Sequence, residues 1–203
     1  MFKFILLSFS FITFVYSADG LYLEYVQPTT VIVTQPQIKK TTSEVKPQVE
    51  KKVVKEIFGV PIRLKIPSIN VDVIVESVNL TPEGAMDTPH TAFHVGWFDL
   101  GPMPGEKGSA VIAGHVDEKN GEDGVFANLN KLKVGDTVYI ENDKGMFLSF
   151  TVRESQLYNP GYADEVFGRD DATHLNLITC DGVWDGVKKS YTKRLVVFAD
   201  LMK

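Results

Sequence analysis

The sequence predicts a mostly β protein that folds as a closed or partly closed barrel. Many short apolar or alternating segments follow one another at regular spacing, separated by turns rich in glycine, proline and asparagine, and only brief stretches have helical spacing. The chain has 203 residues, of which 44% are hydrophobic, and this suits one folded domain with additional segments at its ends.

The N-terminal segment, residues 1–18, is hydrophobic after Lys3 and is expected to direct the chain to a membrane. Val-Tyr-Ser at 15–17 has the form of a signal-peptidase site, which would make the segment a cleaved signal peptide. The alternative is an uncleaved anchor, although the apolar run is short for a complete span. Because Lys3 is the only charge before the run, the N-terminus is expected inside and the body outside.

A linker is expected at 19–58, where threonine, valine, proline, lysine and glutamate dominate and Pro28, Pro36 and Pro47 interrupt regular structure. This composition is typical of an extended, poorly ordered tether. The folded body is therefore expected at 59–203.

The first half of the body contains three expected strands and one expected helix. Residues 62–66 alternate apolar and polar side chains and end at a proline, which predicts a strand with one face in water. Residues 71–75 predict a second strand, and the strongly apolar residues 109–114 predict a buried one. Residues 126–132 have helical spacing over about two turns.

The second half contains the remaining strands. Residues 137–141 and 146–153 flank an Asn-Asp-Lys-Gly turn, in which glycine supplies the positive φ of a hairpin. Residues 158–171 are polar and irregular, with a single helical turn expected among them. The last two strands are the apolar stretches 175–180 and 193–199, the first of which breaks at Asp-Gly.

Composition excludes several classes of function. The net charge of −5 and the pI near 5.4 argue against nucleic-acid binding, which usually needs a basic face. The single cysteine excludes an intramolecular disulfide framework and is a candidate reactive thiol. The sequence has no glycine-rich loop of the P-loop or dinucleotide-binding type.

Three polar residues lie at the ends of apolar strands and are candidates for a common site: Cys180, His115 and Arg194. Cysteine supports acyl transfer through its thiolate, histidine transfers protons near neutral pH, and a guanidinium stabilises a developing oxyanion. Each residue taken alone is more often structural. Lys193 is the alternative cation, because neighbouring residues of a strand point to opposite faces, but lysine lacks the planar fork of arginine.

The segments that carry these residues are Leu-Ile-Thr-Cys at 177–180, Ala-Gly-His at 113–115 and Arg194 before an apolar run. They resemble the Leu-x-Thr-Cys signature, the histidine segment and the final-strand arginine of sortases, the cysteine transpeptidases of bacterial cell surfaces. Val-Gly-Asp-Thr-Val at 134–138 is similar to another recurrent sortase stretch, and the resemblance covers residues 60–203. Gly-Trp-Phe and Met-Pro-Gly, upstream of the histidine, look most like class E or F.

The resemblance implies a closed eight-stranded β barrel with short helices. It implies an enzyme held at the bacterial cell membrane by a single N-terminal segment, with its catalytic domain extracytoplasmic, which favours an anchor at 1–18. The substrate would be a Leu-Pro-x-Thr-Gly-like sorting signal at the C-terminus of an exported protein. The acceptor would be an amine of a cell-wall precursor or of a pilin lysine, for surface-protein anchoring or for pilin polymerisation.

The resemblance also implies a role for each candidate residue. Cys180 would attack the carbonyl of the substrate threonine to form a thioester, and His115 would protonate the leaving amine and deprotonate the incoming one. Arg194 would stabilise the oxyanion and the substrate. Thr179, beside the thiol, and Trp184, shortly after it, are expected to contribute to substrate binding.

No metal or cofactor is expected. The histidines His90, His94 and His174 have no metal-binding spacing with acidic partners. The carboxylates at 117–123 could hold Ca²⁺, as in some sortases, but their spacing matches no EF-hand, so a solvated loop is favoured.

Two alternative functions stay open. A hydrolytic cysteine peptidase would share the thioester and pass the acyl group to water. A non-catalytic, membrane-tethered β-barrel binding module would keep Cys180 inert, whereas a catalytic site predicts selective alkylation that depends on His115. A papain-like protease is excluded because its cysteine precedes its histidine in the sequence.

Overall fold

The computed structural model describes residues 58–118, 120–161 and 163–202. Within these ranges the chain forms eight strands, one short α-helix and two 3-10 helices. The expected membrane segment at 1–18 and the expected linker, apart from its last residue, lie outside the described residues, and both stay predictions. None of the helices in the described ranges combines the length and the apolar character needed to cross a membrane.

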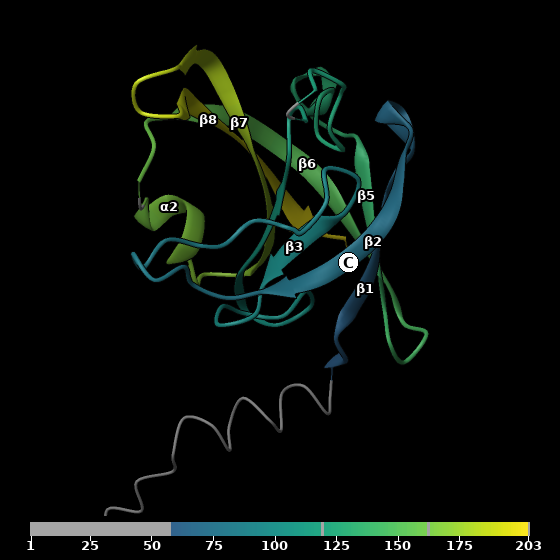
Figure 1. The fold of residues 1–203 in the computed structure, drawn as a ribbon. Coiled ribbons are helices and arrows are strands. Elements are labelled where there is room, and N and C mark those ends of the chain that lie inside the picture. The colour runs from purple at the N-terminus through teal and green to yellow at the C-terminus, as the bar shows by residue number, and fades with distance from the viewer. Residues whose placement is uncertain (1–57, 119, 162, 203) are drawn as a thin grey trace, which may run out of the picture. The chain divides into compact units, whose positions relative to one another are not determined.

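The strands form one closed barrel, as Figure 1 shows. Their bounds are Pro61–Ile66 (β1), Val71–Val78 (β2), Val95–Phe98 (β3), Gly108–Gly114 (β4), Thr137–Asn142 (β5), Phe147–Tyr158 (β6), Thr173–Asp185 (β7) and Ser190–Leu201 (β8). The order around the barrel is β1-β2-β3-β4-β7-β8-β6-β5, and β5 pairs back onto β1. The pairs β2–β3 and β4–β7 are parallel, and the other pairs are antiparallel. The predicted barrel is therefore confirmed.

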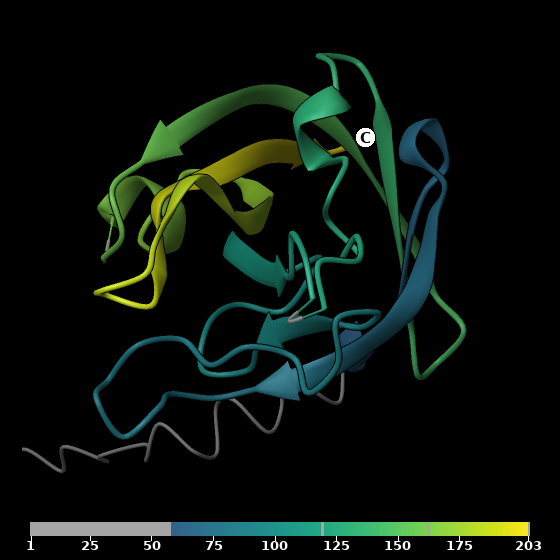
Figure 2. The same cartoon turned by 45° about the horizontal axis from the view of Figure 1, so that its top comes forward.

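The interior of the barrel is filled by side chains from alternate strand positions. Figure 2 shows the strands that surround this interior. In β1, Leu64 and Ile66 are fully buried and the residues beside them are exposed, as the alternation in the sequence predicts. The largest fully buried side chains are Trp97, Phe126 and Phe150. Closure leaves no free strand edge around this core.

Strand β4 and the second half of β8 are buried on both faces. Ala110 and Ile112 of β4 belong to the interior core, whereas Val111 between them packs outside the barrel. The outer cluster consists of Val111, Val166, Val196 and Phe198, and Val166 comes from the short helix α2 (Asp164–Phe167). Burial on both faces explains why these two strands are apolar at successive positions.

The two-turn helix expected at 126–132 is not formed. The segment contains only the 3-10 helix η2 (Leu129–Lys131), with bonds of 3.1 Å from the Leu129 amide to Phe126 and of 3.2 Å from the Leu132 amide to Leu129. Side chains three residues apart lie on the same side of a 3-10 turn, and Phe126, Leu129 and Leu132 all enter the core. The apolar spacing reflects one buried face, but the turn is tighter than an α-helix. A second 3-10 helix, η1, spans Pro67–Ile69 after β1.

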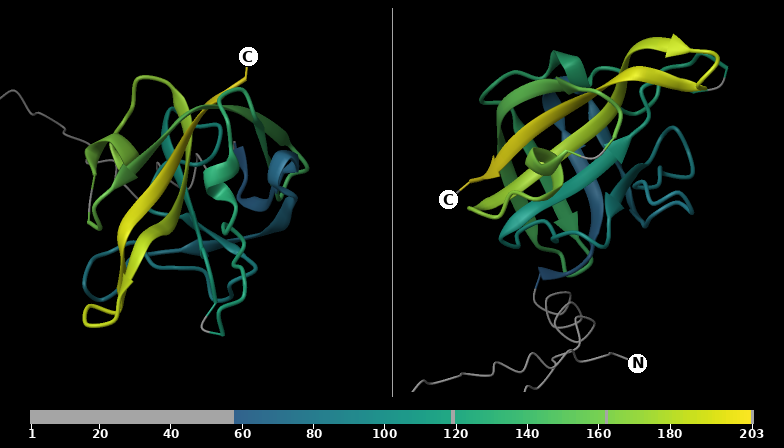
Figure 3. Two further views of the ribbon diagram at one scale, coloured as in Figure 1. Left: turned by 90° about the horizontal axis from the view of Figure 1, so that it is seen from above. Right: turned by 90° about the vertical axis from the view of Figure 1, so that its left-hand side faces the viewer.

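Strands β7 and β8 continue beyond the barrel as a two-stranded arm, formed by residues 181–193 (Figure 3). The sequence predicts that the cysteine strand breaks at Asp181-Gly182, but β7 continues to Asp185 after a bulge between Asp181 and Trp184. Gly182 adopts a φ of 82°, which lets the strand bulge and go on pairing. The side chains of Val183, Trp184 and Val187 on the arm are exposed.

Candidate active site

The barrel brings Cys180, His115 and Arg194 to one groove of about 800 Å³. His115 directly follows β4, and β4 pairs in parallel with β7 up to Ala113 and Ile178, so His115 and Cys180 lie two residues beyond the last pair. Arg194 on β8 pairs directly with Cys180 on β7. Directly opposed residues of an antiparallel pair point to the same face, so the guanidinium and the thiol share one side of the sheet.

Cys180 is half-buried and lines this groove. Burial raises the pKa of its thiol, the nearby Arg194 charge lowers it, and the carboxylate of Asp117 raises it further. Burial is the largest of these effects, so the resting thiol is protonated at neutral pH. Reaction at Cys180 therefore needs a group that removes the proton as the sulfur attacks.

His115 has one ring nitrogen fixed by the backbone. Its Nε2 lies 3.2 Å from the carbonyl oxygen of Pro89. Because a carbonyl oxygen only accepts, Nε2 carries the hydrogen in this contact. In a neutral ring, Nδ1 is then the nitrogen that can take a proton from the thiol.

Arg194 is held by groups at the base of the arm. Its Nη1 donates to the carbonyl oxygens of Tyr191 (3.1 Å) and Lys193 (2.9 Å), and its Nη2 donates to Ser190 Oγ (3.1 Å). Lys193 pairs with Asp181 and donates from Nζ to Asn159 Oδ1 at 2.8 Å. The register therefore places arginine, and not lysine, opposite the thiol.

Thr179 and Trp184 occupy different surroundings. Thr179 is buried, and its Oγ1 donates a 2.8 Å hydrogen bond to the carbonyl oxygen of Gly114. Trp184 is exposed on the arm, with its ring edge-on to Tyr191 at 5.3 Å, and it does not line the groove. A substrate contact at either residue stays a prediction.

Tyr191 and Asp117 form a contact that the sequence does not predict. The Tyr191 hydroxyl donates to the carboxylate of Asp117, which raises the pKa of the tyrosine to about 12. This contact joins the arm to the loop after β4 that carries His115, and both project from the same side of the barrel (Figure 3). No pattern in the sequence marks these two residues, because the contact joins the β8 end of the arm to a loop 74 residues earlier in the chain.

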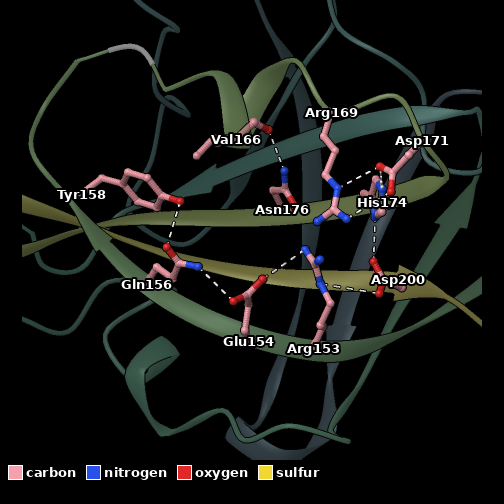
Figure 4. Close-up of polar contacts among 10 residues, drawn as sticks. All are labelled: Arg153, Glu154, Gln156, Tyr158, Val166, Arg169, Asp171, His174, Asn176 and Asp200. Atoms are coloured by element: carbon pink, nitrogen blue, oxygen red, sulfur yellow. Dashed lines mark hydrogen bonds and ion pairs between the residues drawn. The ribbon is translucent and has the colours of Figure 1, made fainter.

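The walls of the groove come from the β2–β3 connection and the β6–β7 connection. The first connection contributes Leu80 and Met86 to the apolar lining, and the second contributes Phe167. The remaining apolar lining residues include Phe98 at the end of β3, Leu100 just after it and Val196 on β8. Figure 4 shows how the second wall is fastened: Asn176 donates to the carbonyl oxygen of Val166 at 2.6 Å, and the His174 ring lies between Asp171 (2.9 Å) and Asp200 (2.6 Å). The groove therefore has a fixed apolar wall next to the polar trio.

Carboxylates of the loop after β4 do not converge. Asp117 and Asp123 pair through their backbones, and the side chain of Asp117 accepts from Tyr191. Across the described ranges, no group of three or more His, Cys, Asp or Glu side chains is arranged to hold a metal ion. The expectation of no cofactor stays a prediction.

Comparison with known proteins decides the family. The family model described as the Sortase domain matches residues 64–202. The chain belongs to the sortase family. Sortases are cysteine transpeptidases that act in general on sorting signals, and the order His115, Cys180, Arg194 along this chain is the order that the resemblance implies.

Solved sortase structures share the fold. Sortase C-1 from Actinomyces oris is 24% identical, with 78% of this chain and 83% of that one covered and a TM-score of 0.58. Sortase C1 from Streptococcus suis is 23% identical, with 77% and 80% covered and a TM-score of 0.57. A pilus-related sortase C of Group B Streptococcus is 21% identical, with 71% and 68% covered and a TM-score of 0.54.

At these sequence identities the comparison with solved structures shows a common fold and no more. The assignment to class E or F stays a prediction. No curated protein matches the chain.

Proposed function

We propose that this sortase cleaves a Leu-Pro-x-Thr-Gly-like sorting signal between threonine and glycine and transfers the acyl group to an amine. The observation that carries the proposal is the pairing of Cys180 with Arg194 in the groove that His115 also lines. Nucleophile, proton carrier and oxyanion partner are the minimum that acyl transfer through a thioester requires.

The first half-reaction forms the thioester. The sulfur of Cys180 attacks the threonine carbonyl carbon while His115 takes the thiol proton, and the carbonyl oxygen becomes an oxyanion beside Arg194. The tetrahedral intermediate then breaks its carbon–nitrogen bond, and His115 returns the proton to the leaving glycine amine. The acyl group remains on sulfur.

The second half-reaction repeats these steps with a different amine. The incoming amine attacks the thioester carbonyl and His115 removes its proton. The carbon–sulfur bond then breaks to give a new amide, and His115 returns the proton to the departing sulfur, which restores the free thiol. The groove of about 800 Å³ has room for several peptide residues, and its apolar wall suits the leucine and proline of the signal.

The proposal includes a place and partners. The segment 1–18 would anchor the chain in a bacterial cell membrane, with the barrel outside the cell, where exported proteins with sorting signals pass. The acceptor would be an amine of a cell-wall precursor or of a pilin lysine. The fold shared with the pilus-related sortase C supports the second of these.

The test is acyl transfer by the purified chain. A small panel of Leu-Pro-x-Thr-Gly-like peptides is offered with and without an added amine, and products are followed by mass spectrometry, with Cys180→Ala as the control. Threonine–glycine cleavage and amine-dependent ligation, both lost in the control, are expected. Cleavage that never leads to ligation would indicate the hydrolytic peptidase. A folded protein that processes no peptide and resists alkylation at Cys180 would indicate the binding module.

A further inference from the structure

We infer that Glu76 is a positioning residue that holds the imidazole of His115 through the segment 87–94. The inference rests on the proposed function, because it concerns the proton carrier of that reaction. Glu76 lies on β2 and does not line the groove, so it acts on His115 through other groups. The segment 87–94 is the part of the β2–β3 connection that leads into β3, and it is called the anchor loop here.

Glu76 fastens the anchor loop with both of its carboxylate oxygens. Oε1 accepts from His94 Nδ1 at 2.5 Å, and Oε2 accepts from His90 Nδ1 at 2.5 Å and from the His90 amide at 3.3 Å. The side chain of Glu76 is only 18% exposed, whereas that of His90 is 84% exposed. A mostly covered carboxylate on a barrel strand thus holds two points of a loop that contains both exposed and buried residues.

The anchor loop contacts His115 at one place and the end of the loop that follows it at another. The Pro89 carbonyl oxygen lies 3.2 Å from His115 Nε2, and the Ala92 carbonyl oxygen accepts from the Val125 amide at 2.8 Å. Pro89 and Ala92 are both buried. Pro89 directly precedes His90 in the chain, so a movement of His90 also moves the Pro89 carbonyl oxygen. This oxygen is the acceptor that keeps the hydrogen on Nε2 of His115.

The charges around Glu76 favour this arrangement near neutral pH. The histidine hydrogen bonds lower the pKa of Glu76 to about 2, so it remains a carboxylate. Glu76 raises the pKa of His90, and the nearby Asp87 acts in the same direction. The ionisable side chains gathered at this cluster are Glu76, His90, His94 and Asp87.

The chemical consequence concerns the tautomer of His115. While Pro89 accepts from Nε2, the neutral ring keeps Nδ1 free to receive the thiol proton. If the carboxylate is lost, the anchor loop is released, and the ring can rotate or change tautomer. A small displacement of a proton carrier lowers the rate of the chemical step more than the binding of substrate.

The test compares Glu76→Gln with a matched control on the same strand, Asp72→Asn. Asp72 pairs with Arg63 at 2.6 Å on the outside of the barrel and does not line the groove. Nitrogen-15 spectra of the histidine rings are recorded on the 203-residue chain, which has four histidines, and His115→Asn assigns the His115 signals. Acyl transfer to an added amine is measured in parallel.

Glu76→Gln is expected to move the His115 ring signals away from the Nε2–H tautomer and to lower kcat by about tenfold to a hundredfold with little change in KM. Glu76→Asp, which keeps the charge, should restore part of the rate, and Asp72→Asn should match the parent in both readouts. His90→Ala, at an exposed site, should shift the signals in the same direction and remains informative if Glu76→Gln fails to fold.

Unchanged His115 ring signals in both Glu76→Gln and His90→Ala would overturn the inference. The ring signals are recorded without peptide. They therefore test this inference even if the parent protein processes no sorting signal, which would instead contradict the proposed function.

Discussion

Thr179 Oγ1 donates a 2.8 Å hydrogen bond to the carbonyl oxygen of Gly114, and this bond joins the residue before Cys180 to the residue before His115. His115 follows β4 and Cys180 lies on β7. These neighbouring strands are parallel, and their backbone pairing ends at Ala113 and Ile178. The threonine hydroxyl therefore continues the connection between β4 and β7 past the end of the ladder. It fixes the position of Cys180 relative to His115.

Replacing Thr179 by valine keeps the shape of the side chain and removes the donor. We expect the free energy of unfolding to fall by about 1 kcal/mol and kcat for acyl transfer to fall about tenfold. Denaturant unfolding and steady-state kinetics measure the two effects. Thr179→Ser keeps the hydroxyl and should retain most of the rate. Equal rates for the valine and serine variants would show that the bond has no role in positioning.

The pKa of Cys180 should respond to its two charged neighbours in opposite directions. Asp117→Asn removes the charge that raises the pKa, and Arg194→Ala removes the charge that lowers it. The pH profile of Cys180 alkylation should therefore move to lower pH in the first variant and to higher pH in the second. Glu141→Gln, on β5, serves as the control and should leave the profile in place. A shift of both variants in the same direction would refute this electrostatic account.

Gly124 is required by the loop that carries His115. A Cβ at this position would lie 2.4 Å from the carbonyl oxygen of His115, which is backbone and cannot move aside cheaply. Gly124→Ala is expected to displace His115 and to lower acyl transfer by about tenfold or more. Gly186→Ala on the arm meets no atom within 4 Å and is the matched control. Activity of Gly124→Ala within the range of this control would contradict the prediction.

The stability that Glu76 contributes should depend on pH in two ways. Its folded-state pKa is lowered from 4.5 to about 2, so this stabilisation is present above 4.5 and is lost as the pH falls toward 2. The pKa of His90 is raised from 6.5, so the stabilisation from its charge is present below 6.5 and is lost as the pH rises through the raised value. The Tm difference between the parent and Glu76→Gln should therefore be largest between pH 4.5 and 6.5. A difference that is constant from acid to alkaline pH would contradict this linkage.

Most strands, and the three residues Cys180, His115 and Arg194 that meet in one groove, could be picked out from local patterns in the sequence. Alternation marks β1, a continuous apolar run marks β4, and Cys180 stands out as the only cysteine. The sequence alone could not decide between Arg194 and Lys193 as the cation beside Cys180. That depends on the register of β7 and β8, and a shift of one residue would have placed Lys193 opposite the thiol. A local pattern predicts which residues face the core, but it does not predict which loops meet.

The contacts that position the site join strands to loops that are distant in sequence, so no local pattern predicts them. Glu76, His90 and His94 are ordinary surface residues in the sequence, and only the barrel places one carboxylate against both rings. The contact between Tyr191 and Asp117 likewise joins segments that are distant in sequence. The Asp-Gly after Cys180 is typical of a strand end, but pairing with β8 carries the strand through a bulge.

The most direct test of the central claim is the intact mass of the protein during reaction with a Leu-Pro-x-Thr-Gly-like peptide. The account predicts an added mass equal to the peptide acyl group ending at threonine, located on Cys180, absent in Cys180→Ala and formed about a hundredfold more slowly in Arg194→Ala. Addition of an amine should discharge it into a ligated product. An unmodified protein with every peptide, together with a thiol in the folded chain that resists alkylation, would contradict the claim that Cys180 is a catalytic nucleophile.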